Sequence, residues 1–351
     1  MKGNIAVIIP AHNEEGVISN TIKQFLRIVD IEDIYVVDDG SDDETFLLSE
    51  RLGVNVVKSI GRGKAQALNF AISYFNILYR YDYILFMDAD TYPDESFINN
   101  MMPHFLNDNN FDINCVVGRV KGTSVNWISK YRQWEYQISH MIHKRAQSIL
   151  KSIIVVPGCA TIYRSFVFKK LKIPEGTLTE DMDLTFLMHR KGLNNMVFED
   201  KAVVYTQDPQ KLRDFIKQLY RWYTGFWQVV RKHNIPWKGQ VLDLEVAMLA
   251  SEGLYNGLLS IIFLLSIPPL LAINRLTIFA VPLLFDLFVF FIPTIVWSAI
   301  SDKDYLRILY LPQFYFLRFI SCMIFFISFF KGYLSVEKLY FWQSKRYALE
   351  R

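Results

Sequence analysis

The sequence predicts an α/β domain with a mostly parallel sheet, followed by amphipathic helices and an apolar C-terminal region. Short β-rich runs alternate with segments of helical spacing in the first two thirds of the chain, which is typical of parallel sheets. From about Leu254 onward, the 351-residue sequence is apolar enough for lipid to be its solvent. We therefore expect a catalytic domain over residues 1–207, interfacial helices over 208–252, a transmembrane region over 253–334 and a polar, basic tail over 335–351.

The predicted strands and helices of the first domain follow one another closely. The strand-like runs are Ile5–Ile9, Ile34–Val37, Val54–Val57, Tyr83–Met87 and Ile153–Val156. The segments with helical spacing are Glu14–Ile28, Lys64–Tyr79, Trp127–Lys151 and Asp181–Lys191. Polar residues follow the second and fourth runs directly. In a parallel sheet such residues meet at the carboxyl ends of the strands, where nucleotides bind.

Gln210–His233 has apolar residues at helical spacing with basic residues among them. A core-packed helix and a membrane-surface helix both fit this pattern, and the position just before the apolar region favours the surface. Three stretches then approach spanning length, namely Gly253–Ile273, Leu276–Ile300 and Leu311–Leu334. Prolines permit kinked or re-entrant segments. Three crossings from a cytosolic domain would place the basic tail outside, against the positive-inside tendency, so two or three crossings remain open.

Composition excludes several classes of protein. A net charge of +3 without a block of Lys or Arg argues against nucleic-acid binding. Cys115, Cys159 and Cys322 are far apart, which argues against a disulfide framework or a zinc site and suits a reducing compartment. The N-terminal apolar run is too short for a signal peptide and is better interpreted as a first strand.

Asp88-Ala89-Asp90 follows a hydrophobic run and is a candidate metal motif. Two carboxylates one residue apart at the end of a strand can bind Mg²⁺ or Mn²⁺, with phosphate oxygens completing the shell. Such a cation would neutralise the charge that builds on a leaving diphosphate. Many motifs of this kind are instead solvated loop acids, and at this strand end the two interpretations are balanced.

Two other polar segments are candidates for nucleotide binding. Asp38-Asp39-Gly40-Ser41 could accept hydrogen bonds from a base or ribose, although an Asx turn explains the same residues. Gly61-Arg62-Gly63-Lys64 suggests phosphate recognition by a loop and a helix N-terminus, but the spacing is not that of a P-loop. Lys64 is equally well interpreted as a surface lysine.

Two motifs later in the chain are candidates for chemistry and for gripping the substrate. Thr179-Glu180-Asp181 could simply cap a helix, or Asp181 could act as a general base toward an acceptor hydroxyl. Gln218-Leu219-Tyr220-Arg221-Trp222 offers an amide, a guanidinium and an indole on adjacent helical turns. Arginine can bind phosphate and tryptophan can stack on a sugar, whereas a membrane-surface Arg-Trp pair is the simpler alternative.

Taken in order, these motifs resemble those of family 2 glycosyltransferases of the processive, membrane-integrated kind. The matching segments are 10–14 (PAHNE), 38–41 (DDGS), 63–69 (GKAQALN), 88–90 (DAD), 144–147 (KRAQ), 157–159 (PGC), 179–181 (TED) and 218–222 (QLYRW). They extend over about 220 residues, and their order is far more specific than any one of them. The chain most resembles synthases of poly-N-acetylglucosamine, hyaluronan and chitin, with cellulose synthases more distant.

The resemblance implies a GT-A fold and an inverting transfer from a UDP-sugar, with Asp181 as the base and Mg²⁺ or Mn²⁺ bound by Asp88 and Asp90. It assigns nucleotide-sugar binding to Pro10, Asn13, Glu14, Asp39, Lys64, Asp88, Asp90, Gln218, Arg221 and Trp222. It assigns acceptor contacts to Gly158, Cys159, Glu180 and Trp222. A multi-pass protein of the plasma membrane with a cytosolic catalytic domain is expected.

Three functions remain open at this stage. The first is a synthase that extends a β-linked polysaccharide from UDP-N-acetylglucosamine or a related UDP-sugar. The second is a transferase that adds one or a few sugars to a lipid acceptor, such as a polyprenyl phosphate or glycolipid. The third is a membrane transporter regulated by a nucleotide. Polymer synthases of this family usually carry membrane helices before the catalytic domain, whereas here the first strand begins at Ile5. A partner membrane subunit or a homo-oligomer would then complete an export channel, or the chain does not export its product.

Overall fold

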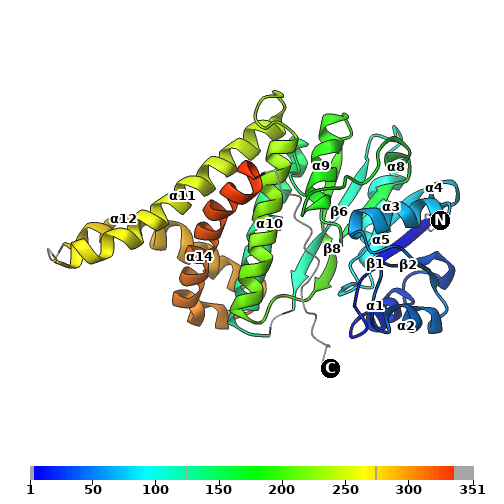
Figure 1. Cartoon of the computed structure of the whole chain (residues 1–351), viewed down its shortest axis with the longest axis horizontal. Coiled ribbons are helices and arrows are strands. Elements are labelled where there is room, and N and C mark those ends of the chain that lie inside the picture. The colour runs from blue at the N-terminus through cyan, green and yellow to red at the C-terminus, as the bar shows by residue number, and fades with distance from the viewer. Residues whose placement is uncertain (1–3, 124, 273–274, 336–351) are drawn as a thin grey trace. The chain divides into compact units, whose positions relative to one another are not determined.

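The computed structural model describes residues 4–123, 125–272 and 275–335, and its elements are labelled along the chain in Figure 1. The described chain divides into two compact units. The first contains residues 4–121 and 140–207, and the second contains residues 122–139 and 208–335. Of the expected tail 335–351, all but the first residue lies outside the described residues.

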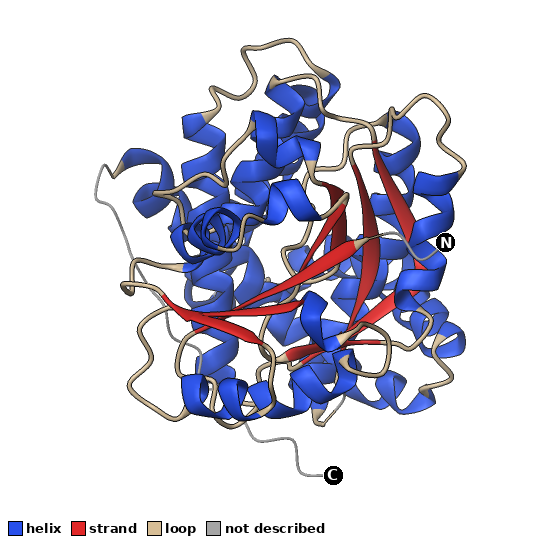
Figure 2. Cartoon of the chain, turned by 90° about the vertical axis from the view of Figure 1, so that its right-hand side faces the viewer, coloured by secondary structure: helices blue, strands red, loops and turns tan. Residues whose placement is uncertain are grey.

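The first unit is built around one twisted eight-stranded sheet in the order β3-β2-β1-β4-β7-β6-β8-β5 (Figure 2). The strands are β1 Ile5–Ala11, β2 Ile34–Asp38, β3 Asn55–Lys58, β4 Tyr83–Phe86, β5 Thr91–Pro93, β6 Cys115–Gly122, β7 Thr161–Arg164 and β8 Met196–Thr206. Strands β3, β2, β1 and β4 pair in parallel, whereas β7 is antiparallel to β4, β6 to β7 and β5 to β8. The sheet is therefore mixed, and the prediction of a mostly parallel sheet holds for the half whose strands were expected.

Short helices connect the strands of the first unit. They are α1 Ile18–Phe25, η1 Ile31–Asp33, α2 Thr45–Arg51, α3 Lys64–Tyr74, α4 Ile77–Arg80, α5 Phe97–Leu106, α7 Arg145–Leu150, α8 Phe166–Lys170 and α9 Glu180–Arg190. The helix expected over Lys64–Tyr79 is divided in two, because Asn76 adopts a left-handed φ of 53° that ends the helical path. Asparagine tolerates that conformation better than most residues do.

The core of the first unit fixes the strand ends that carry the candidate motifs. Every residue of β1 and of β2 is buried. Ile8, Val37 and Ile84 from three neighbouring strands share one cluster with Leu68 of α3 and Leu184 of α9. Burying each such side chain stabilises the fold by roughly 1.5–3 kcal/mol. The starts of α3 and α9 are therefore anchored to the same core as β4.

The segment Ile153–Val156, expected to be a strand, forms no strand in the structure. A short apolar run cannot be assigned by periodicity alone, and here the backbone groups bond to side chains instead of a neighbouring strand. The partners are Lys144, Thr185 and His189. The segment is consequently a buried loop that leads to Gly158 and Cys159.

The second unit is helical. Its elements are α6 Trp127–Ile138, α10 Leu212–Lys232, α11 Val241–Ala272, η3 Leu276–Phe279, α12 Ala280–Phe285, η4 Asp286–Phe291, α13 Ile292–Ser301, η5 Tyr305–Tyr310, α14 Leu311–Phe329 and η6 Phe330–Leu334. The π-helical turn η2 Ser139–Lys144 follows α6 and leads back into the first unit. The apolar stripe of α10, for which a membrane surface was favoured, packs inside this unit. Phe215 and Leu219 lie in one cluster with Tyr131 of α6 and Phe314 of α14.

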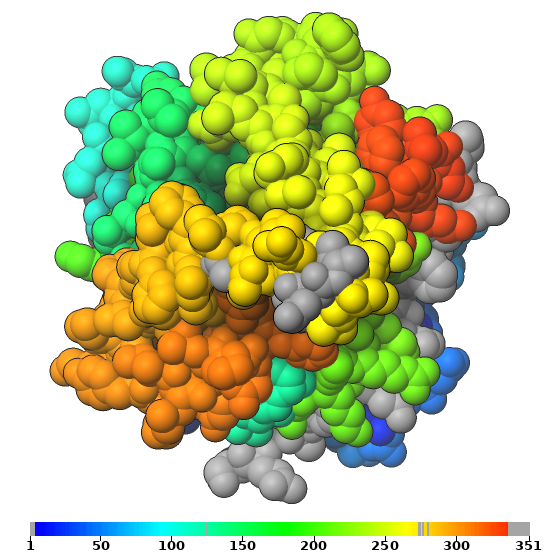
Figure 3. All heavy atoms as spheres, turned by 90° about the vertical axis from the view of Figure 1, so that its left-hand side faces the viewer, coloured from blue at the N-terminus to red at the C-terminus, as the bar shows by residue number. Residues whose placement is uncertain are grey.

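Three helical segments are long and apolar enough to cross a membrane: Val241–Ala272, Val281–Ser301 and Tyr305–Leu334. They overlap the three stretches expected from the sequence, and the first begins twelve residues earlier than expected. Large apolar side chains such as Leu265, Val281 and Phe288 are exposed on them. Figure 3 shows this surface in yellow and orange. Exposed apolar area of this extent is typical of a surface that lipid or protein covers.

The contact between α11 and α14 depends on two glycines. Gly253 and Gly257 are four residues apart, so they lie on one face of α11, and both meet α14. A Cβ at Gly257 would stand 2.7 Å from the carbonyl oxygen of Cys322 and 2.5 Å from Cβ of Phe326. Small residues at this spacing let two helix backbones approach closely within a membrane.

We predict that Gly257→Leu weakens the packing of α11 on α14, because the new side chain has no space beside the backbone of Cys322. Overpacking of this kind costs about 1–3 kcal/mol. Thermal unfolding of the detergent-solubilised protein measures the loss. Leu258→Phe is the matched control, since Leu258 is exposed on the same helix. Equal stability of the two variants would show that this contact does not hold the helices together.

Candidate active site

The ammonium group of Lys64 joins three elements of the first unit. Lys64 is the first residue of α3, and its Nζ lies 2.5 Å from Oδ1 of Asp88, just after β4, and 3.1 Å from Oε1 of Glu180 at the start of α9. Its side chain is only 15% exposed. Burial by itself would lower the pKa of Lys64, but the carboxylates of Asp88, Glu180 and Asp181 outweigh burial and raise it. Lys64 is therefore a permanent cation in a cluster of acids.

Asp181 follows Glu180 at the start of α9, and the pKa of its carboxyl group is raised. Burial, with the charges of Glu180 and Asp88, raises its pKa to about 6, against the opposing effects of Lys64 and of the Met182 backbone N–H. That N–H donates to Oδ1 of Asp181 at 2.8 Å. A carboxylate with such a pKa accepts a proton more readily than an ordinary aspartate, as a general base must.

Gly158 and Cys159 lie beside the same acids. A Cβ at Gly158 would stand 3.0 Å from Nζ of Lys64 and 3.7 Å from Cβ of Asp181, so any larger residue would crowd the lysine. Burial raises the pKa of the Cys159 thiol, and the nearby carboxylate of Asp88 adds to this effect. The thiol is therefore protonated near neutral pH and does not serve as a nucleophile.

Asp39 is buried and uses its carboxylate within the protein. It accepts hydrogen bonds from Oγ of Ser59 and from the backbone N–H of Gly63, the latter at 2.7 Å. The loop before Lys64 is held close in a second way, because a Cβ at Gly40 would stand 3.1 Å from Cα of Gly61. Gly40 also has a φ of +74°. These contacts fix the backbone from which Lys64 extends.

Pro10 is the last residue but one of β1, where it pairs with Val37 of β2. The turn that follows β1 contains Asn13 and Glu14 and is bound to the segment after β2. The Asn13 N–H donates to Oγ of Ser41 at 2.9 Å, and Oδ1 of Asn13 accepts from the Asp42 N–H at the same distance. Glu14 is 7% exposed and Asn13 is exposed. The first two motifs of the chain thus form one surface at the carboxyl ends of β1 and β2, as the parallel pairing of the strands requires.

Asp88 and Asp90 supply the only carboxylates that the sequence assigned to a metal. Asp88 is partly exposed beside Lys64, and Asp90 is 4% exposed. Among the described residues, no group of three or more His, Cys, Asp or Glu side chains is arranged to hold a metal ion. This donor set does not fit a cation bound by protein alone. It fits a Mg²⁺ or Mn²⁺ ion held by one or two carboxylates together with phosphate oxygens.

Gln218, Arg221 and Trp222 belong to α10 in the second unit, whereas Lys64, Asp88 and Asp181 belong to the first. Two of them are held by Arg132 of α6. The Arg132 guanidinium donates to Oε1 of Gln218 at 3.1 Å and lies 4.5 Å from the centre of the Trp222 ring. Arg132 is itself 3% exposed and paired with Glu135 at 2.6 Å. Arg132 therefore fixes the side chains of Gln218 and Trp222 on α10.

Sequence reasoning gave no role to three residues that contact these motifs. Arg132 lies in an otherwise unremarked helix, and only its charge on a face with Tyr131 and Trp134 could have drawn attention to it. Lys144 is the first residue of the 144–147 motif and is buried. Thr185 lies one helical turn after Asp181 and is fully buried.

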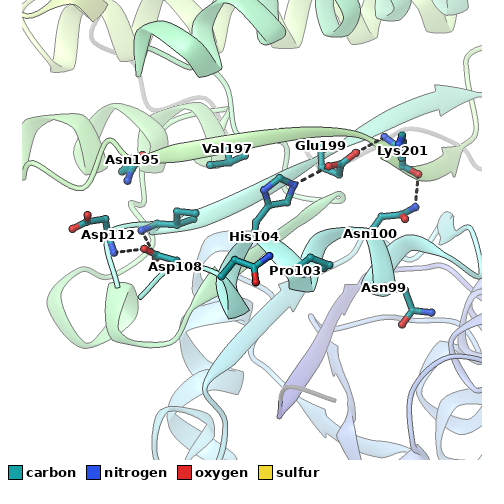
Figure 4. A pocket seen from close by; sticks show the side chains of 12 residues that line it. Asn99, Asn100, Pro103, His104, Asp108, Asp112, Asn195, Val197, Glu199 and Lys201 are labelled. Atoms are coloured by element: carbon teal, nitrogen blue, oxygen red, sulfur yellow. Dashed lines mark hydrogen bonds and ion pairs between the residues drawn. The ribbon is translucent and has the colours of Figure 1, made fainter. Parts of the chain in front are cut away.

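An open groove of about 670 Å³ lies along α5 and β8 of the first unit (Figure 4). None of the predicted site residues lines it. Its polar side chains bond to one another: His104 to Glu199 at 2.8 Å, and Asn100 to the carbonyl oxygen of Lys201 at 2.9 Å. The groove contains neither Lys64 nor the acids around it, and we take the cluster at the end of β4 as the candidate site.

Comparison with known proteins finds a family model and several relatives that match part of this chain. Residues 6–172 match glycosyl transferase family 2. Poly-beta-1,6-N-acetyl-D-glucosamine synthase of Staphylococcus aureus is 27% identical over 235 residues, which cover 64% of this chain and 55% of the relative. Probable glycosyltransferase YdaM of Bacillus subtilis is 27% identical over 243 residues, covering 65% and 56%. The matched region thus spans little more than half the length of these curated relatives.

A solved structure shows the same fold. The mannosyltransferase PcManGT from Pyrobaculum calidifontis, in complex with GDP-Man and Mn²⁺, aligns with a TM-score of 0.51 and 17% sequence identity. The alignment covers 66% of this chain and 64% of the other. The GT-A fold expected from the sequence is confirmed, with a mixed sheet in place of a mostly parallel one.

We predict that Lys64→Met destabilises the first unit, because Asp88, Glu180 and Asp181 then repel one another without a counterion. Removing one partner of a buried pair costs about 3–5 kcal/mol, and partial exposure reduces this to roughly 1–3 kcal/mol. The loss should be smaller at pH 5 than at pH 8, because Asp181, with a pKa of about 6, takes up a proton as the pH falls.

Urea unfolding at the two pH values measures this effect. Lys23→Met is the control, because it is the same substitution at a lysine that is exposed on α1. A loss that does not depend on pH would show that Lys64 acts by packing and not by neutralising the acids.

Proposed function

The chain carries a glycosyl transferase family 2 domain over residues 6–172, and from this premise we propose that it is a membrane-bound inverting glycosyltransferase. It transfers a sugar from a UDP-sugar, with UDP-N-acetylglucosamine as the preferred candidate, to a growing β-linked polysaccharide. The observation that carries the proposal is the meeting of Lys64, Asp88, Glu180 and Asp181 at one point, with the pKa of Asp181 raised to about 6. The names of the matched S. aureus relatives support the choice of sugar and product.

Asp181 acts as the general base in this proposal. Its carboxylate takes the proton of an acceptor hydroxyl, and the acceptor oxygen forms a bond to the anomeric carbon of the donor. The bond between that carbon and the UDP oxygen breaks on the opposite side, and UDP leaves with the bonding electron pair. One displacement inverts the configuration, which agrees with a site that offers one base and a protonated Cys159 beside it.

The other residues of the cluster bind and orient the substrates. Lys64 is a permanent cation close to the leaving diphosphate, and Asp88 and Asp90 are the residues that would hold Mg²⁺ or Mn²⁺ together with that diphosphate. The cation would stabilise the negative charge that develops on UDP. Glu180, Gly158 and Cys159 border the acceptor beside Asp181. The end of β1 with Pro10 and the turn with Asn13 and Glu14, braced by Ser41, offer polar groups to the uridine, next to the loop that Asp39 fixes.

We also propose that the second unit takes part in substrate binding and attaches the protein to lipid. Gln218, Arg221 and Trp222 would bind the diphosphate and the acceptor sugar, a role supported by the way Arg132 holds two of them on α10. The three apolar segments would anchor the protein in the plasma membrane as a multi-pass protein, with the catalytic domain in the cytosol where UDP-sugars are made. A partner membrane subunit or a homo-oligomer would complete any export channel.

Incubation of the membrane-extracted protein with labelled UDP-sugars and Mg²⁺ or Mn²⁺, followed by sizing of the product, tests the proposal. The expected product is a long polymer made from UDP-N-acetylglucosamine. A short glycolipid would replace the polymer synthase by a transferase of limited addition to a lipid acceptor. Absence of UDP release with every donor would instead favour a nucleotide-regulated membrane protein without turnover.

Asp181→Asn should lower kcat by about a thousandfold or more, because the amide cannot accept the proton of the acceptor and catalysis by a positioned base contributes 10²–10⁴-fold. UDP binding, measured by calorimetry, should stay within about threefold of wild type. The melting temperature should be unchanged or higher, since burial and neighbouring acids oppose the charge of Asp181. Equal loss of turnover and UDP binding would remove Asp181 from the role of base.

The pH dependence of kcat/KM, which reflects the free enzyme, should report the ionisation of Asp181. The basic form is required, so kcat/KM should rise with pH through an apparent pKa of about 6 and reach a plateau above it. Glu180→Gln should move this pKa downward, because it removes the neighbouring charge that helps to raise it. A rise centred near 4, or a profile that Glu180→Gln leaves in place, would contradict the assignment.

A further inference from the structure

The buried loop that carries Gly158 and Cys159 is fixed by side chains and not by a sheet. Gln147 and Thr161 bond to its backbone from nearby in the sequence. Three further hydrogen bonds come from Nε2 of His189 with the carbonyl oxygen of Ile153 at 2.8 Å, from Nζ of Lys144 to that of Val155 at 2.9 Å, and from the N–H of Val156 to Oγ1 of Thr185 at 3.0 Å. A sheet would have satisfied these groups with backbone partners alone. Each bond instead depends on the identity of one side chain.

Two of these side chains belong to the helix face that carries the proposed base. Asp181, Thr185 and His189 are spaced by four residues on α9 and therefore lie along one face. Oγ1 of Thr185 accepts from Val156 and donates to the carbonyl oxygen of Asp181 at 2.7 Å. One buried hydroxyl thus links the loop backbone to the backbone of the base itself.

This link determines how closely the loop approaches the base. Gly158 is two residues beyond Val156, and its Cβ position would be 3.7 Å from Cβ of Asp181 and 3.0 Å from Nζ of Lys64. Space is so limited there that a displacement of about one ångström would change which group an acceptor hydroxyl meets. Misplacement of that size can cost a hundredfold in rate.

Lys144 also bonds to the loop, and the burial of its charged group is not explained by stability. It is 6% exposed, and burial lowers its pKa to about 8, although the charge of Asp181 opposes that effect. Its carbonyl partner, Val155, carries no full charge. A methionine of similar length would pack in the same place without desolvating a charge, and such replacements are often neutral or stabilising. A buried lysine here therefore calls for a reason other than stability.

We propose that Lys144 and Thr185 are positioning residues of the transferase, which hold the loop Ile153–Cys159 between the end of η2 and α9 and so hold the acceptor hydroxyl against Asp181. This inference rests on the proposed function and adds the residues that set the distance between the acceptor hydroxyl and the base. Lys144 bonds to Val155, and Thr185 bonds to Val156 and Asp181, whereas Lys64 bonds to Asp88 and Glu180. Their loss should therefore lower kcat while donor binding persists.

Lys144→Met provides the first test, with Lys169→Met as the matched control at an exposed lysine of α8. We expect Lys144→Met to lower kcat by about 10–100-fold, to leave the Kd for UDP within about threefold of wild type and to leave the melting temperature unchanged or higher. The control should match wild type in all three. An unchanged kcat, or a parallel fall of kcat, UDP affinity and melting temperature, would overturn the proposal by showing no role or a purely structural one.

Thr185→Val and Thr185→Ser provide a second test that does not depend on the lysine. Valine keeps the shape but removes the hydroxyl, so kcat should fall about 10–100-fold with the KM for the donor unchanged. Serine keeps the hydroxyl, and kcat should return to within about threefold of wild type. Equal activity of the two variants would contradict the positioning role. Absence of turnover by the wild-type protein with every donor would refute the proposed function itself, which distinguishes that failure from a failure of the positioning role.

Discussion

The arrangement of the candidate site depends on one buried cation. Lys64 can occupy its place only because Asp88 and Glu180 bring negative charge to within 3.1 Å, and those acids can lie so close to each other only because Lys64 is between them. The three residues begin or follow α3, β4 and α9, so the ion cluster ties the positions of three elements together. The pKa of Asp181 results from the same balance, in which burial and two acids oppose one lysine. A diphosphate entering beside Lys64 would change that balance, which couples donor binding to the base.

The helical unit also contains buried or membrane-segment cations, and these are arginines paired with acids and amides. Arg307 is 2% exposed and donates to Gln133 at 2.8 Å and to Gln137 at 3.1 Å, while Asp302 lies 2.8 Å away. Within the apolar segments, Arg318 forms two hydrogen bonds with Asp286 at 2.7 and 3.0 Å. Charges in such segments are costly unless paired. Pairing across helices, with close contact at Gly253 and Gly257, makes these helices one body.

How far the sequence predicts this protein depends on the length and regularity of each signal. Strands β1, β2 and β4 were expected because each is a continuous apolar run, and the acids that follow them lie together because the strands are parallel. Strand β5 has three residues and β7 has four, too short for any pattern to show.

The run Ile153–Val156 has the composition of a strand, but its partners are the side chains of Lys144, Thr185 and His189, which lie up to 36 residues away in sequence. Likewise, the stripe of α10 could not reveal whether lipid or α14 would cover it. The roles proposed for Lys64, Asp88, Asp90 and Asp181 rest on the order of motifs, and the raised pKa of Asp181 could come only from the structure.

A structure of the protein with UDP and Mn²⁺, with the metal located by its anomalous scattering, would test whether the cluster around Lys64 is the donor site. We expect Mn²⁺ to be bound by the diphosphate and the carboxylates of Asp88 and Asp90, Nζ of Lys64 to turn from Asp88 toward the diphosphate, and Asp181 to stay free of the metal. The nucleotide bound elsewhere, for instance in the groove along α5 and β8, or Mn²⁺ bound to Asp181, would contradict this expectation.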